Sequence, residues 1–506
     1  MKRPYHWALL SVFPAIFIAS NNIGAVSLFS LLQAVAIFFF CGFVLACVFS
    51  LAFRSFLKGT LVASILISAV SFYTPLWLAL GIWLKSEFVS DLVLPYGSAA
   101  IILFAIVMVV RAREKKLLPW NTFFNYFSAI IVVCAVANGF LKAYNTPNVN
   151  APKPLALSPS KTPDVFYIIL DGYARGDTLK EIYGFDNKDF LNFLRNEGFY
   201  IAERCTTNYP QTISSIASSL NMDYISSLAP SVPPDYIGRL PLMRLIRKGR
   251  VIKTLRSLGY TIVTASTGVS DIEIPGSDRV IKPPGGNPVI EEIMSQIKLP
   301  FAMDYLSGLL YKKHRDRILA TLDSFREIGS SKNPVFYYAH IMLPHPPFIF
   351  RADGTFSPPR KRFSYGDGNF FGDRTNYKKK YIAQLSYLNN RMERIVSTLL
   401  SRDTKPIIIV QSDHGSGSTY NMTKLNRDSL KERFGILCAF YFPDHNYSLL
   451  YSDISPVNIF RVVFNSAFRG GLPMLPDRSY FVGYFKHYNP VDVSEVVKAV
   501  HDSPRS

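Results

Sequence analysis

Cysteine is scarce in this chain, and its few cysteines form no metal-binding pattern. There are 5 among 506 residues, and no pair has the Cys-x-x-Cys spacing of a zinc knuckle. Cys41, Cys47 and Cys134 fall in apolar segments, where we interpret them as small hydrophobic residues. Only Cys205 and Cys438 lie in the more polar part of the chain. The sequence leaves open whether these two form a disulfide.

Acidic residues are also few: 36 Asp and Glu stand against 55 Lys and Arg, which gives a formal net charge of +19. A basic balance suits contact with nucleic acid or with an anionic membrane surface. The topology inferred below places the polar part outside the cytoplasm. We therefore expect no nucleic-acid partner and favour anionic lipid headgroups.

Charged residues are absent from the middle of five apolar runs in the first third of the chain. A membrane-spanning helix needs about 20 apolar residues, so the first and fourth runs are short unless their flanks are included. We predict a transmembrane anchor domain of five helices over residues 1–144. Because no charge lies inside a run, nothing indicates an ion pathway or a transporter. The runs are Trp7–Asn21, Leu28–Phe53, Thr60–Leu84, Tyr96–Val110 and Phe123–Leu141.

Basic residues between the runs predict the orientation. Arg54 and Lys58 separate the second run from the third, and four basic residues between Arg111 and Lys116 separate the fourth from the fifth. Short loops rich in Lys and Arg stay in the cytoplasm. The N-terminus is therefore expected inside and everything after the fifth run outside. Residues 145–163 carry many prolines and predict an extended linker.

Residues 164–506 alternate between β-prone apolar runs and amphipathic helical stretches. This rhythm predicts an α/β domain with a central mixed or mostly parallel sheet flanked by helices. The predicted strands are 165–170, 261–265, 335–339 and 406–411, and the main predicted helices are 188–197, 251–258, 315–327 and 380–400.

Side chains that suit a metal follow three of these strands. Asp171 follows the first, His340 the third, and Asp413-His414-Gly415 the last. Ligands of α/β proteins bind beyond the carboxyl ends of the strands, so we expect these side chains at one edge of the sheet. Carboxylate and imidazole together suit a divalent metal, and Gly415 is expected to let the backbone turn sharply. Taken alone, Asp171 suits a turn or a helix cap equally well.

Thr212 begins a stretch of small residues, Thr-Ile-Ser-Ser-Ile-Ala-Ser-Ser-Leu-Asn, that predicts a helix. The N-terminus of a helix attracts phosphate, and a hydroxyl placed there can be activated as a nucleophile. The alternative is an ordinary N-cap hydroxyl. Ser214 and Ser215 are competing candidates for the nucleophile.

Two histidines lie in the proline-rich segment His340-Ile-Met-Leu-Pro-His345-Pro-Pro-Phe348. Either could protonate a leaving oxygen or hold a phosphate group. Arg433 and His487 are further candidates for phosphate or metal contacts, although nothing near them in the sequence singles them out.

Four motifs together resemble the alkaline phosphatase/sulfatase superfamily. They are Ile169-Leu170-Asp171-Gly172, Asn208-Tyr209-Pro210-Gln211-Thr212, the segment from His340 to Phe348, and Ser412-Asp413-His414-Gly415. The nearest likeness is the membrane-anchored branch of lipoteichoic acid synthases and of phosphoglycerol or phosphoethanolamine transferases. The resemblance implies a metal held by Asp171, Thr212, Asp413 and His414. It also implies that Thr212 is the nucleophile and that His345 contacts the substrate or leaving group.

The chain departs from that superfamily in three ways. The Cys-x-Pro-Ser-Arg context of sulfatases is missing, so sulfate ester hydrolysis is not expected. Asp171 stands where lipoteichoic acid synthases generally have Glu. The cysteine-rich pattern of phosphoethanolamine transferases is also absent.

The resemblance implies a metal-dependent phospho-group transferase in a bacterial plasma membrane. We predict that it moves a phospholipid-derived headgroup to a cell-envelope glycan through a phosphothreonine, with Thr212 and His345 catalytic and His340 and Arg433 binding substrate. Mn²⁺ or Zn²⁺ fits the ligands best, and Mg²⁺ or Ca²⁺ is also compatible. The alternatives are a membrane-bound phosphodiesterase or phosphatase with water as acceptor, and a non-catalytic scaffold for envelope assembly.

Overall fold

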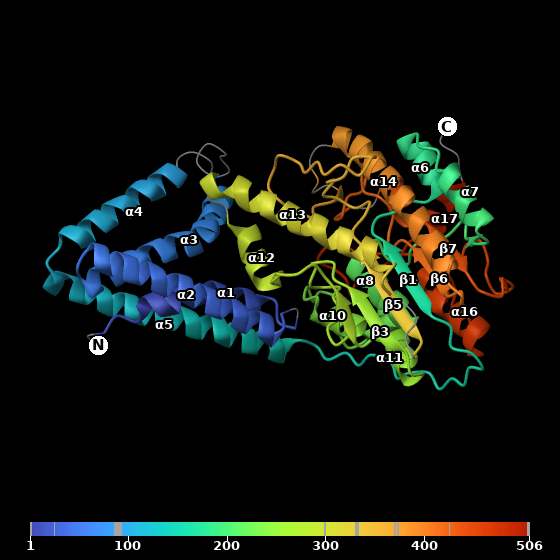
Figure 1. Ribbon diagram of the computed structural model, residues 1–506, viewed down its shortest axis with the longest axis horizontal. Coiled ribbons are helices and arrows are strands. Elements are labelled where there is room, and N and C mark those ends of the chain that lie inside the picture. The colour runs from blue at the N-terminus through green and yellow to red at the C-terminus, as the bar shows by residue number, and fades with distance from the viewer. Residues whose placement is uncertain are drawn as a thin grey trace. The chain divides into compact units, whose positions relative to one another are not determined.

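The structure is a computed structural model that describes residues 3–24, 26–84, 94–297, 300–328, 333–368, 371, 374–424 and 426–502. The chain divides into two compact units (Figure 1). Unit 1 contains residues 1–146, 285–310 and 360–363, and unit 2 contains residues 147–284, 311–359 and 364–506.

Unit 1 is helical, and each of the five predicted apolar runs lies within a helix, except that Phe53 follows the end of α2. Among the described residues, three helices are long and apolar enough to cross a membrane: α2, α5 and the Phe56–Leu76 part of α3. Helix α1 and the stretch Pro95–Arg111 are apolar but shorter, so the five-span count stays a prediction. The helices are α1 (His6–Asn21), α2 (Leu28–Ala52), α3 (Phe56–Leu84), α4 (Leu94–Arg111) and α5 (Glu114–Asn145).

A sixth helix of unit 1, α12 (Pro288–Gln296), comes from much later in the chain. Its Val289 packs with Ala15, Ile18 and Ala34 of α1 and α2. Asn287 caps α12 by accepting from the backbone of Val289 at 3.0 Å, and its side-chain amide donates to the carbonyl of Ser30 at 3.0 Å. Residues 285–310 and 360–363, which fall inside the predicted domain of residues 164–506, belong to unit 1. Sequence periodicity shows that a helix has an apolar face but not which surface covers that face.

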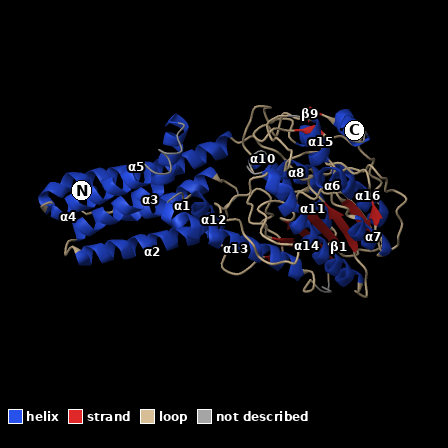
Figure 2. Cartoon of the chain, turned by 90° about the horizontal axis from the view of Figure 1, so that it is seen from above, coloured by secondary structure: helices blue, strands red, loops and turns tan. Residues whose placement is uncertain are grey.

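Unit 2 is built on a seven-stranded mixed sheet, as predicted. Its order is β2-β7-β6-β1-β5-β3-β4. The five strands from β6 to β4 are parallel, whereas β7 pairs antiparallel with both β6 and β2. The small pair β8 (Tyr480–Phe481) and β9 (Val491–Asp492) is antiparallel. All of these strands lie in unit 2 (Figure 2). The main strands are β1 (Val165–Leu170), β2 (Tyr200–Ile201), β3 (Thr261–Ala265), β4 (Arg279–Ile281), β5 (Val335–Ile341), β6 (Ile407–Gln411) and β7 (Cys438–Tyr441).

Helices cover both faces of this sheet because successive side chains of a strand point to opposite sides. Phe166 of β1 contacts Phe325, which directly follows α13, whereas Tyr167 contacts Phe460 of α16. The central strand β1 is buried along its whole length. The other helices of unit 2 are α6 (Gly176–Tyr183), α7 (Lys188–Asn196), α8 (Thr212–Asn221), α9 (Ile225–Leu228), α10 (Leu240–Arg247), α11 (Arg250–Ser257), α14 (Arg374–Leu400), α15 (Arg427–Phe434) and α17 (Ser494–Asp502), while α13 spans Pro300–Ser324 and α16 Pro456–Phe468.

Two smaller expectations have clear outcomes. Strand β5 continues to Ile341 instead of ending at residue 339, so His340 lies inside the strand, opposite Ile169 of β1. Apart from Asn145, the last residue of α5, the predicted linker has no helix or strand. It packs on unit 2, where Leu155 donates its backbone N–H to Thr254. The Sγ atoms of the buried Cys205 and Cys438 lie 2.7 Å apart.

Candidate metal and phosphoryl-transfer site

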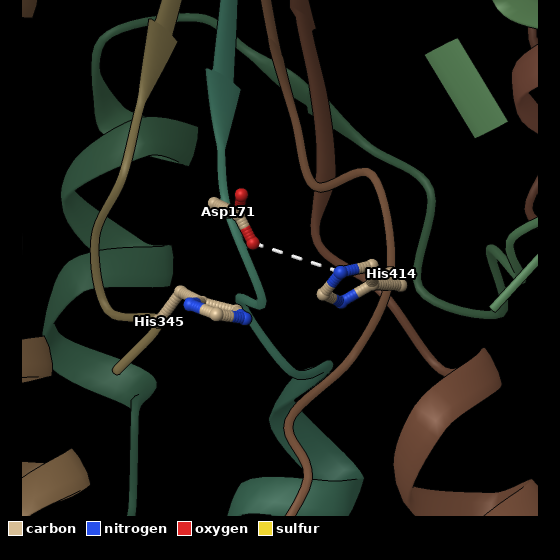
Figure 3. A group of neighbouring side chains, drawn as sticks. All are labelled: Asp171, His345 and His414. Atoms are coloured by element: carbon tan, nitrogen blue, oxygen red, sulfur yellow. Dashed lines mark ion pairs between the residues drawn. The ribbon is translucent and has the colours of Figure 1, made fainter. Parts of the chain in front are cut away.

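The carboxyl ends of β1, β5 and β6 bring the predicted metal-binding side chains together. Asp171 directly follows β1, His345 lies in the segment after β5, and His414 lies in the loop after β6; all three face a common space (Figure 3). Two sets of ligand atoms lie within 4.8 Å of one another: Asp171 with His345 and His414, and Asp171 with His340 and Asp413. The sheet therefore gathers residues that are more than 240 positions apart in sequence.

Hydrogen bonds tie the three loops to one another at this edge. The backbone N–H of Asp171 donates to Ile341 at 3.0 Å, and that of His345 donates to the Asp171 carbonyl at 3.0 Å. The Ser412 hydroxyl donates to the Leu170 carbonyl at 2.7 Å. The backbone N–H of Gly172 donates to Oδ1 of Asp413 at 3.2 Å. These bonds fix the backbone at Asp171 and His345 and one oxygen of the Asp413 carboxylate.

Two buried carboxylate oxygens indicate a cation site. Among the residues that the structure describes, Asp171 Oδ1 and Asp413 Oδ2 have no hydrogen-bond partner, although both side chains are about 1% exposed or less. A buried acceptor oxygen left without a hydrogen bond costs about 1–3 kcal/mol, and more when it carries charge, which a bound cation would offset. Oxygen and imidazole ligands at one point suit a divalent metal. The side chains therefore fit the metal that the sequence predicts.

The hydrogen bonds of His414 place its proton on Nδ1 and its lone pair on Nε2, the nitrogen nearer the two carboxylates. Nδ1 lies 2.9 Å from the Gly415 carbonyl, which can only accept, so Nδ1 carries the proton. Nε2 lies 3.0 Å from Nη2 of Arg433, which can only donate, and 3.3 Å from Oδ2 of Asp413. Burial and the Arg433 charge lower the pKa of His414 below its ordinary value. A neutral imidazole fixed by a carbonyl is the usual form of a metal-binding histidine.

Gly415 has a different role from the one expected. It is not among the glycines with positive φ, so the sharp turn is not its reason. A Cβ at this position would lie 2.1 Å from the Glu432 carbonyl oxygen. Glycine is required because the loop after β6 packs directly against the backbone of α15.

Thr212 is the first residue of α8, and its hydroxyl points to the same site. The N-cap of α8 is Gln211, so Thr212 does not have the ordinary capping role. Its Oγ1 lies 3.0 Å from Nε2 of His414. The Thr212 residue is partly exposed, whereas Ser214 and Ser215 are buried. Of the three hydroxyls, Thr212 alone combines solvent access with contact to a predicted metal ligand.

The two competing serines have other partners. Ser215 donates to the backbone carbonyl of Asp413 at 2.8 Å and so helps to place that residue. Ser214 lies 3.2 Å from Nδ1 of His487, a buried histidine whose other nitrogen has no partner among the described residues. The structure therefore places His487 beside α8 as a partner of Ser214.

His340 lies against a predicted metal ligand. Its Nε2 is 3.1 Å from Oδ2 of Asp171, and both side chains are buried. Burial opposes ionisation of Asp171, but the nearby His345 charge and the hydrogen bond from His340 outweigh it and hold the pKa of Asp171 below its ordinary value. Burial also opposes a charge on His340, yet the Asp171 carboxylate raises the pKa of this histidine. His340 thus orients Asp171 while the other oxygen of that carboxylate, Oδ1, faces the cation site.

Arg433 and His345 are two further candidate residues that lie close to His414. Arg433 is 2% exposed, and its Nε donates to the Pro210 carbonyl at 2.9 Å. The rings of His345 and His414 are 6.0 Å apart, and Nδ1 of His345 faces the Pro346 carbonyl at 2.5 Å. The remaining nitrogen, Nε2 of His345, is therefore the one available to a ligand.

Sequence reasoning missed one charged residue of this site, Asp367. It is 1% exposed and accepts hydrogen bonds from Arg433 at 2.5 Å and from the Tyr377 hydroxyl at 2.8 Å. Burial would raise the pKa of Asp367, but Arg433, followed by His345 and His414, holds it at about 2. Asp367 follows no strand and stands in an unremarkable Tyr-Gly-Asp-Gly segment, so no local pattern could have marked it.

Comparisons with known proteins found similarity to solved structures only, with low sequence identities and low TM-scores. No protein-family model matches the chain, and no curated protein matches it. Solved structures similar to it include the C-terminal periplasmic domain of EcEptC from Escherichia coli (10% identity, 68% of this chain and 96% of that one, TM-score 0.43). Another is the phosphonate monoester hydrolase of Agrobacterium radiobacter (11% identity, 63% and 80%, TM-score 0.39).

The integral membrane protein lipooligosaccharide phosphoethanolamine transferase A from Neisseria meningitidis is similar over a longer stretch. It is 11% identical, with 91% of this chain and 95% of that chain covered and a TM-score of 0.38. Similarities with TM-scores below 0.5 do not establish a family or an activity for this chain. An activity must therefore be argued from the side chains of the site alone.

Proposed function

We propose that this protein is a membrane-anchored, metal-dependent phospho-group transferase that uses Thr212 as its nucleophile. The observation that carries the proposal is that Thr212 Oγ1 lies 3.0 Å from Nε2 of His414, beside two buried carboxylate oxygens that have no hydrogen-bond partner among the described residues. The sequence motifs that resemble the alkaline phosphatase/sulfatase superfamily support the same reaction class.

The residues of the site suit attack on a phosphodiester. Asp171, Asp413, His414 and the Thr212 hydroxyl would hold a divalent cation, Zn²⁺ or Mn²⁺. When bound, such a cation favours the ionised hydroxyl and offsets charge on the phosphoryl oxygens. Thr212 starts α8, whose free N–H groups and positive dipole end favour a phosphate group at this point.

The reaction has two displacements. In the first, the Thr212 hydroxyl loses its proton to water and Oγ forms a bond to phosphorus, while the bond from phosphorus to the oxygen of diacylglycerol breaks and His345 gives that oxygen a proton. In the second, a sugar hydroxyl of an envelope glycan gives its proton to His345 and attacks phosphorus, and the bond to Thr212 breaks, so that Oγ regains a proton from water. Arg433 would hold a phosphoryl oxygen during both displacements. His340, first assigned to substrate, is buried against Asp171 and suits orientation of that carboxylate better.

The membrane helices fit this chemistry because a phospholipid donor is available only at a bilayer. We assign the catalytic function to unit 2 and the anchoring function to unit 1. Basic residues between the apolar runs support a cytoplasmic N-terminus, five crossings and a unit 2 outside the cytoplasm. Protease added to intact spheroplasts should then degrade unit 2, and protection of unit 2 would contradict this orientation.

Product analysis tests the reaction. Purified full-length protein with Mn²⁺ or Zn²⁺ and a phospholipid labelled in its headgroup should release diacylglycerol and pass the labelled headgroup to an added glycan. The Thr212→Ala variant should do neither. Free headgroup as the main product, even with glycan present, would identify the hydrolase alternative. Absence of bound metal together with a fully functional Thr212→Ala variant in cells would identify the scaffold.

A further inference from the structure

One buried carboxylate, that of Asp367, faces two groups to which the proposed function gives roles. Its Oδ2 lies 2.5 Å from Nη1 of Arg433 and 3.6 Å from Nε2 of His345. The Tyr377 hydroxyl donates to the other oxygen, Oδ1, at 2.8 Å. Asp367 therefore connects the proposed phosphate-holding arginine with the proposed proton donor, which come from α15 and from the segment after β5.

The packing around Asp367 shows that the loop after β6 leaves room for this carboxylate. A Cβ on Gly417 would lie 2.5 Å from Oδ1 of Asp367 and 2.7 Å from Oδ2, closer than non-bonded atoms approach. Gly417 is not among the residues with positive φ, so its backbone conformation does not itself require glycine. Glycine is needed here because the carboxylate occupies the space of a side chain.

We propose that Asp367 is a positioning residue that holds Arg433 and His345 on the same side of the reacting phosphoryl group. This inference rests on the proposed function. Arg433 donates through Nη1 to Asp367 and to the Gly415 carbonyl at 3.1 Å, which fixes the plane of its guanidinium group. Its Nη2 then points to His414. Without the carboxylate, neither the Arg433 nor the His345 side chain would be held in place. His345 would then no longer be positioned to transfer a proton to the leaving oxygen.

The test uses two phosphodiesters that transfer the same group but differ in the leaving oxygen: methyl p-nitrophenyl phosphate and methyl phenyl phosphate. A proton donor matters more for the poorer leaving group, phenol. With full-length protein loaded with Mn²⁺, His345→Gln should lose about 100-fold or more in kcat on the phenyl ester, and much less on the nitrophenyl ester. If Asp367 acts through His345, Asp367→Asn should show the same preferential loss, by about tenfold or more.

Two further variants separate positioning from folding. Gly417→Ala keeps the Asp367 charge but displaces its carboxylate, so it should show the same leaving-group pattern. Tyr377→Phe removes a hydrogen bond to the far oxygen of Asp367 and should affect both esters equally and slightly. Equal losses on both esters, or no loss, in Asp367→Asn and Gly417→Ala would overturn the inference while His345→Gln keeps its pattern. Equal losses of kcat on both esters in His345→Gln itself would overturn the proposed role of His345, and the inference with it.

Discussion

The Nε2 atom of His414 lies 3.0 Å from the Thr212 hydroxyl oxygen, although the two residues are 202 positions apart in the sequence. The loop after β6 supplies the imidazole and the first turn of α8 supplies the hydroxyl. The proton on Nδ1, held by the Gly415 carbonyl, leaves the lone pair on Nε2, which faces both the Thr212 hydroxyl and Nη2 of Arg433 at 3.0 Å.

Metal affinity should depend on Asp413 and, less strongly, on His340. Asp413→Asn removes a charged ligand, whereas His340→Gln removes the hydrogen bond that orients Asp171. Loss of such an orienting partner typically weakens metal binding by about 10–100-fold, and we expect that range for His340→Gln and a larger loss for Asp413→Asn. Competition with a fluorescent chelator measures both.

The matched control for metal affinity is Asp353→Asn, which changes an exposed carboxylate elsewhere in unit 2. It should leave metal affinity unchanged. Equal affinity in wild type, His340→Gln and Asp413→Asn would show that the metal, if bound, lies somewhere else.

Arg433→Lys should lower turnover by about 100-fold, the usual effect of removing one donor to a phosphoryl or oxyanion oxygen. A lysine cannot reproduce the planar set of donors that reaches Pro210, Asp367 and Gly415. Steady-state rates on a phosphodiester measure the change. Arg461→Lys is the control, because Arg461 is also largely buried and donates to backbone carbonyls, those of Met222 and Pro473. A similar loss in both variants would mean that only stability has changed.

The stability of unit 2 should fall in acid partly because of His487. Burial, and to a lesser extent the Arg239 charge, lowers the pKa of His487 to about 3 from 6.5. Between those values the unfolded chain binds a proton that the folded chain does not. The contribution of His487 to stability therefore decreases as pH falls below 6.5, by about 1.4 kcal/mol per pH unit.

His487→Gln should remove that contribution. The difference between the melting temperatures of wild type and variant, measured from pH 7 down to pH 4, should shift in favour of the variant as pH falls. A difference that stays constant over this range would contradict an uncharged, buried His487.

Much of this fold and the convergence of the candidate metal-binding residues could be predicted from the sequence, because both depend on short-range patterns. Strand β1 is an unbroken apolar run that ends on Asp171, and β6 is another that ends just before Asp413 and His414. Parallel strands then place their following residues at one edge. Thr212 could be chosen from the helix start that it marks.

The remaining features depend on packing between distant segments. Asp367 has its role only because Arg433 and His345 approach it from two other elements. Helix α12 packs on α1 and α2 although it comes from much later in the chain. The need for glycine at position 415 also depends on a residue farther along the chain, because the Glu432 carbonyl oxygen leaves no space for a Cβ there. No pattern of neighbouring residues in the sequence shows that these distant residues meet in the fold.

The most direct measurement of the central claim is the mass of the Thr212 peptide after the full-length protein, loaded with divalent metal, has reacted with phospholipid and been quenched in acid. A headgroup phosphate ester on Thr212, absent without metal, is the predicted result. The same ester on Ser214 or Ser215, or an unmodified peptide in protein that still turns over the lipid, would contradict it.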